Sequence, residues 1–66
     1  MNNQESELIM TIKELRSKTG LSQHKFGEKY HISFKNIQNW EQGQRKCPDY
    51  VMYLLNRIIT EIDYKD

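Results

Sequence analysis

The chain has 66 residues, of which 36% are hydrophobic and 29% are charged, and its formal net charge is +1. This length allows one domain with one small core, and the composition excludes both a disordered chain and a membrane span of roughly 20 apolar residues. One cysteine excludes an internal disulfide, and the first residues have no signal-peptide hydrophobic region, so we expect a cytoplasmic protein.

The first predicted helix follows a polar stretch. Residues 1–10 are expected to be an N-terminal extension that is partly disordered. Thr11 and Glu14 then have the spacing of a capping box, in which each side chain binds a free amide at the start of a helix. A helix is therefore predicted over 12–19, with Gly20 as its left-handed stop.

Capping residues predict two more short helices. Ser22 can cap a helix over 23–30, and Ser33 can cap a helix over 34–42 that stops at Gly43. Each of these helices is about two turns long, which is too short to persist without packing. Their stability must therefore come from contacts with the rest of the domain.

The third predicted helix has an apolar face and a polar face. Ile37 and Trp40 are three residues apart, so they lie on the same side of the helix. Lys35, Asn36 and Asn39 lie on the opposite side. We expect the first face to join the core and the second to face solvent.

A fourth helix is predicted from residue 48 or 49 to about 62, because Pro48 suits the first turn of a helix. Apolar residues at helical spacing can close the core from this helix, namely Val51, Leu54, Leu55 and Ile58. Four helices without an alternating strand pattern predict an all-α domain over 11–62, with a C-terminal tail over 63–66.

Positive charge is concentrated in the middle of the chain. Residues 13–46 contain eight lysines and arginines against three glutamates, whereas residues 1–12 and 47–66 each carry net negative charge. A basic centre of this kind is typical of a surface that faces phosphates. The alternative is a solvated helical surface that is rich in lysine.

Several short motifs occur together: T-I-K-E-L-R at 11–16, G-L-S-Q at 20–23, F-G-E-K-Y at 26–30, I-S at 32–33 and I-Q-N-W-E-Q-G at 37–43. With them, residues 11 to about 58 resemble the lambda-repressor-like, Cro-type (XRE) helix-turn-helix family. The resemblance implies a compact four- to five-helix domain whose second and third helices form a DNA-binding helix-turn-helix. His31 departs from the family pattern, which usually has glycine at this turn position, so we expect a strained left-handed residue there.

The resemblance also implies roles for individual residues. Base edges would be contacted by Phe34, Lys35 and Asn39. Backbone phosphates would be contacted by Gln23, Asn36, Gln42, Gln44, Arg45 and Lys46. A structural salt bridge would join Arg16 to Glu41.

The chemistry of the three base-contacting residues agrees with these roles. Asparagine can bind adenine through two hydrogen bonds, and lysine can donate to guanine. Phe34 could contact a thymine methyl group, or its ring could instead fold back onto the domain surface. Lys35 could read a base or make a general phosphate contact.

We therefore expect a small bacterial or phage transcriptional regulator, a repressor that binds duplex DNA as a homodimer and is associated with the nucleoid. Exposed residues of the fourth helix would form the dimer contact, with Tyr50, Tyr53, Ile59 and Ile62 as candidates. The alternative is an antitoxin or adaptor that uses the same fold to bind a partner protein. We expect neither an enzyme nor a metal or cofactor site, since the sequence has no nucleophile-base pair, glycine-rich phosphate loop or zinc-ligand spacing.

Overall fold

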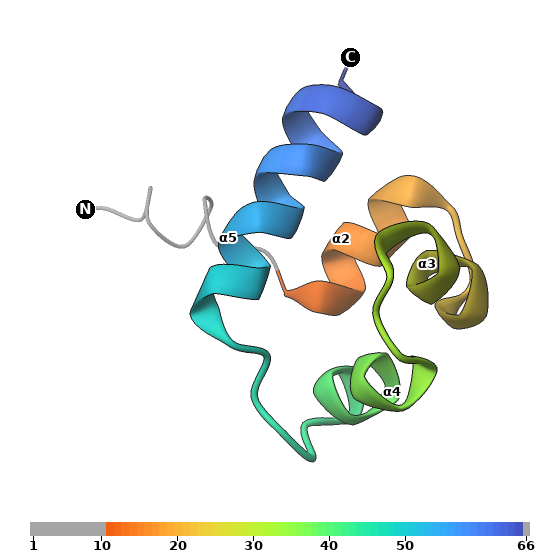
Figure 1. The fold of residues 1–66 in the computed structure, drawn as a ribbon, viewed down its shortest axis with the longest axis vertical. Helices are drawn as coiled ribbons and strands as arrows, with labels where there is room; N and C mark the ends of the chain where they lie inside the picture. Colours follow the sequence, from red (N-terminus) through yellow and green to blue (C-terminus); the bar gives the residue numbers. More distant parts are fainter. Residues whose placement is uncertain (1–10, 66) are drawn as a thin grey trace.

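The computed structural model describes residues 11–65, and every regular element in this range is helical. These elements are α2 (Ile12–Thr19), α3 (Gln23–Tyr30), α4 (Phe34–Gln42), α5 (Asp49–Ile58) and the π-helical segment η1 (Ile59–Asp63), shown in Figure 1. The prediction of an all-α fold is confirmed for this range, which contains no strand. The expected N-terminal extension, residues 1–10, lies outside the described residues.

The first three helices begin at the predicted caps. Thr11 and Glu14 form the capping box: the Thr11 amide donates to Glu14 Oε1 at 2.8 Å, and the Glu14 amide donates to Thr11 Oγ1 at 3.1 Å. The Ser22 and Ser33 hydroxyls accept from the amides three residues later. Because each hydroxyl satisfies an amide that the helix leaves free, these residues set where the helices start.

Left-handed residues end the same three helices. Gly20 has φ 76°, Gly43 has φ 80°, and His31 adopts φ 61° and ψ 42°. The expectation of a left-handed His31 is confirmed. This conformation costs a residue with a Cβ about 1 kcal/mol, so the turn between α3 and α4 is held against local strain.

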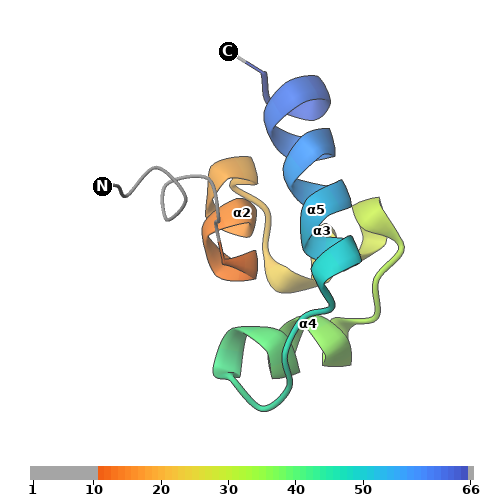
Figure 2. The same cartoon turned by 90° about the vertical axis from the view of Figure 1, so that its left-hand side faces the viewer.

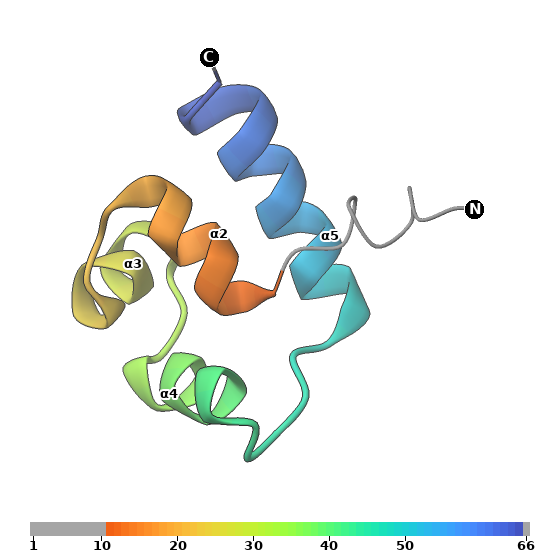
Figure 3. The ribbon, with the colours of Figure 1, turned by 180° about the vertical axis from the view of Figure 1, so that it is seen from behind.

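Six side chains form the buried core, and every described helix contributes at least one of them: Ile12, Leu15, Phe26, Ile37, Leu55 and Ile59. Figures 1 and 3 show α5 and η1 running past α2, with α3 and α4 on the other side of the fold. Trp40, predicted to lie in the core, packs against it while remaining partly exposed. The short helices therefore share one core, as their lengths require.

The core-facing side of α5 differs from the predicted one. Leu54, expected in the core, is 50% exposed, whereas Ile59, expected at a dimer contact, is fully buried. Because α5 and η1 pack against α2, Leu55 and Ile59 face inward together with the half-buried Met52. The assignment of Ile59 to an exposed interface is therefore wrong.

Gly27 allows the turn after α3 to pass close to the helix. A Cβ at this position would lie 2.5 Å from the Ile32 carbonyl oxygen and 3.2 Å from Ile37 Cδ1. A side chain would therefore clash with the turn and crowd α4. The close approach compensates for the cost of a glycine in the middle of a helix, which is about 1 kcal/mol.

The end of the chain is attached to α3. The Tyr30 hydroxyl donates to Asp63 Oδ2 at 2.9 Å, Lys29 Nζ lies 3.9 Å from the same oxygen, and Tyr64 packs against the core. Burial and the bond to Asp63 raise the pKa of Tyr30. Asp63 and Tyr64, assigned to the tail by sequence, thus contact the helical domain. Within the described range, no helix has the length and apolar character needed to cross a membrane.

Candidate nucleic-acid interface

Helix α4 lies at one end of the described structure. In Figures 1 and 2 α4 and the loop that follows it form the lower end, while α5 and η1 extend away from them toward the opposite end. Its inner side carries the buried Ile37. In the same figures no other helix lies beyond its outer side, so this is the surface that a large partner can approach.

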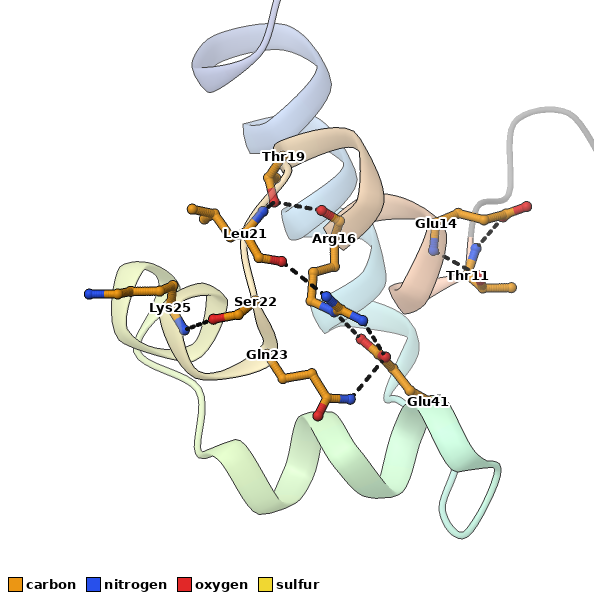
Figure 4. Close-up of polar contacts among 9 residues, drawn as sticks. All are labelled: Thr11, Glu14, Arg16, Thr19, Leu21, Ser22, Gln23, Lys25 and Glu41. Atoms are coloured by element: carbon orange, nitrogen blue, oxygen red, sulfur yellow. Dashed lines mark hydrogen bonds and ion pairs between the residues drawn. The ribbon is translucent and has the colours of Figure 1, made fainter.

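A polar cluster attaches α4 to α2, as Figure 4 shows. Arg16 donates from Nε to Glu41 Oε2 at 2.7 Å and from Nη2 to Glu41 Oε1 at 3.0 Å, and from Nη1 to the Leu21 carbonyl at 3.0 Å. The Glu41 side chain is only 5% exposed. Hydrogen bonding from Arg16 lowers the pKa of Glu41, so the carboxylate stays charged within the fold. The salt bridge implied by the family resemblance is present.

Gln23 belongs to the same cluster. Its Nε2 donates to Glu41 Oε1 at 3.0 Å. This bond directs the Gln23 side chain toward α4 and makes it a contact between α3 and α4. The second Nε2 hydrogen remains available to a phosphate, since an amide nitrogen carries two. The predicted phosphate contact by Gln23 therefore stays a prediction, made by a residue that also has a structural bond.

Four polar side chains occupy the outer side of α4, and their spacing places them together. They lie opposite Ile37 and Glu41 on the helix: Lys35, Asn36, Asn39 and Gln42. Asn39 is half-buried and the other three are exposed. We call this set the outer face of α4. It combines amide groups, which can both donate and accept, with one positive charge.

The first turn of α4 contains no acidic residue. The partial positive charge at the helix start is therefore not neutralised by a carboxylate on the helix itself. Ser33 satisfies only the Asn36 amide among the amides of this turn. The local field at this end of α4 favours a negatively charged partner.

Three polar residues follow α4, and the backbone there is held in place. The Gln44 and Arg45 amides both donate to the Asn39 carbonyl, at 2.9 and 3.3 Å, while Gly43 donates to Trp40. These bonds form a Schellman motif, which fixes the backbone of the residues that directly follow the helix. Gln44, Arg45 and Lys46 are all exposed, and Lys46 makes an exposed ion pair with Asp49 at 3.8 Å.

Phe34 lies differently from the other predicted base-contacting residues. Its ring stacks on the imidazole of His24 in α3, with ring centroids 3.8 Å apart and planes 6° from parallel. One face of the ring is thus covered by the protein, and the contact of Phe34 with a base stays a prediction. His24 was not among the predicted site residues, because two residues ten positions apart in the chain give no sequence signal for this contact.

Burial and the neighbouring Asp49 raise the pKa of the Cys47 thiol, which disfavours the reactive thiolate. Residues 11–65 contain no group of three or more histidine, cysteine or acidic side chains arranged to hold a metal ion.

Comparisons with known proteins give no match: no family model fits the chain, and no curated protein or solved structure is significantly similar to it.

Proposed function

We propose that this protein is a sequence-specific DNA-binding protein, a small transcriptional repressor of the lambda-repressor-like, Cro-type class. In this proposal α3, the turn and α4 act as a helix-turn-helix, and α4 enters the major groove. Asn39 and Lys35 would contact base edges, while the exposed polar residues around them would contact phosphates.

The observation that carries the proposal is the outer face of α4. Polar side chains cover a helix side that no other described element approaches, and Glu41 fastens the opposite side to Arg16. A base-reading helix needs both properties, because its side chains must reach the groove from a fixed backbone. The start of α4, whose first turn has no acidic residue, adds attraction for phosphates.

The proposal includes a homodimer formed through α5. The outward side of α5 and η1 carries large exposed apolar side chains: Tyr50, Tyr53, Leu54 and Ile62. A single module of this size reads few base pairs, so two copies on half-sites about 34 Å apart would give useful affinity. The proposed dimer contact therefore includes the exposed Leu54 and no longer includes the buried Ile59.

The same apolar surface supports a second candidate, an antitoxin or adaptor in which α5 binds a different protein. Exposed aromatic side chains are common in protein interfaces. The two candidates differ in their response to salt. A DNA binder loses affinity steeply as salt rises, because each neutralised phosphate releases counterions, whereas a protein-binding module has little DNA affinity even at low salt.

Selection of bound sequences from random duplexes tests the proposal. We expect an enriched site with two inverted half-sites, and a linear fall of log affinity for that site with log salt concentration. Enrichment of a single half-site would contradict the homodimer but not DNA binding. Absence of both enrichment and binding in dilute buffer would contradict the function itself.

A further inference from the structure

An aromatic pair connects the two helices of the proposed DNA-binding unit. His24 in α3 and Phe34, the first residue of α4, stack with centroids 3.8 Å apart and nearly parallel planes. His24 is exposed and Phe34 is half-buried. The stack therefore lies at the surface, beside the start of the helix that carries the outer face.

The half-buried Phe34 ring stacks on the imidazole on one face and also borders open space. An open concavity of about 330 Å³ lies beside the two rings, and its lining also includes Gly27 and Ile32. Removal of the imidazole would leave that face of the Phe34 ring without its stacking partner. Stacking therefore favours the observed orientation of the ring, in which part of the Phe34 side chain remains accessible.

We infer that His24 is a positioning residue for base recognition, which holds the Phe34 ring so that it contacts a thymine methyl group. The inference rests on the proposed DNA-binding function. An apolar ring discriminates between bases only where it meets a methyl group closely, since it has no hydrogen bond to offer. Burial of one methyl group corresponds to about a fourfold difference in affinity.

Deoxyuridine isolates this contact, because replacing thymine by uracil removes the methyl group alone. Each thymine of the selected site is replaced in turn, and the affinities of the two duplexes are compared. We expect wild-type protein to bind one such pair with about a fourfold preference for thymine. Phe34→Ala should abolish that preference and so identify the position.

Three substitutions of His24, compared with Phe34→Ala, test whether His24 positions the Phe34 ring or contacts DNA directly. His24→Ala and His24→Gln should lose the thymine preference at the Phe34 position, while their affinity for random duplexes changes less than twofold. His24→Phe should keep the preference, since it preserves a stacking ring. Nuclear magnetic resonance of the free variants gives an independent readout: the Phe34 ring protons should move downfield when the stacked ring is removed by His24→Ala.

The outcomes distinguish the inference from the function on which it rests. Retention of the thymine preference by His24→Ala would overturn the positioning role while leaving DNA binding intact. Retention by His24→Gln with loss in His24→Phe would also overturn it and would assign His24 a hydrogen bond to DNA. Absence of duplex binding by wild-type protein would instead contradict the proposed function.

Discussion

Arg16 and Glu41 form a bidentate ion pair between α2 and α4, with hydrogen bonds of 2.7 and 3.0 Å. The Glu41 side chain is 5% exposed and that of Arg16 is 20% exposed. The pair therefore holds the helix with the outer face against the helix that supplies Ile12 and Leu15 to the core. Loss of the pair should affect both stability and the placement of α4.

Glu41→Gln should destabilise the fold by about 3 kcal/mol, because it leaves the partly buried Arg16 charge without a counter-charge. Urea unfolding measures the change as a lower midpoint at constant slope. Glu28→Gln is the matched control, since Glu28 is 73% exposed and lies 4.0 Å from Lys25. The control should change stability by less than about 0.5 kcal/mol. Equal losses in the two variants would contradict the structural role of the pair.

The same pair should make stability depend on pH in the acid range. Hydrogen bonding from Arg16 lowers the pKa of Glu41 below its ordinary 4.5. The contribution of ionised Glu41 to folding stability is therefore fully present above the pKa of Glu41 in the unfolded chain. This contribution is lost as pH falls through the pKa of Glu41 in the folded protein, because the unfolded chain takes up the proton first. Between pH 5 and pH 3, wild-type protein should lose more stability than Glu41→Gln. Parallel pH profiles would contradict this linkage.

His31→Gly should stabilise the domain by about 0.5 kcal/mol. Glycine removes the strain of a left-handed residue, and the gain is partly offset by its greater freedom in the unfolded chain. Gly20→Ala is the converse control, because φ there is 76° and an added Cβ meets nothing within 4 Å. In thermal unfolding, the melting temperature should rise for His31→Gly and fall for Gly20→Ala. A lower melting temperature for His31→Gly would mean that the His31 side chain makes a stabilising contact in solution.

Leu54→Glu should abolish the proposed homodimer without unfolding the protomer, since Leu54 is 50% exposed on α5. Burial of a carboxylate in an apolar contact is costly, whereas the same group on a free surface remains hydrated. Sedimentation velocity should give a dimer for wild-type protein and a monomer for the variant, with unchanged helical circular dichroism. Ser17→Glu, an exposed substitution on α2, should leave the dimer intact. If wild-type protein sedimented as a monomer both with and without its DNA site, the proposed homodimer would be contradicted.

Local signals in the sequence predicted the helix bounds well. Thr11, Ser22 and Ser33 each satisfy an amide at a helix start, and Gly20 and Gly43 take the left-handed conformation that stops a helix. These interactions span a few residues, so they can be read from neighbouring positions. The bounds of α2, α3 and α4 follow from them.

Contacts between distant residues were harder to predict. The segment formed by α5 and η1 is apolar on more than one side, so its pattern did not show that Ile59 faces the core while half of Leu54 is exposed. That choice depends on how α5 packs against α2. The stack of His24 on Phe34 likewise depends on the angle between α3 and α4. Neither relationship has a signature at fixed sequence spacing.

Competition binding by Asn39→Ala and Arg45→Ala is the most direct test of the outer face of α4 as a DNA-reading surface. Each variant is titrated with the selected site and with random duplex at fixed salt. Asn39→Ala should lower the ratio of the two affinities about tenfold and relax one base position, whereas Arg45→Ala should weaken binding to both duplexes equally. Full discrimination by both variants would contradict the assignment of this face to base recognition.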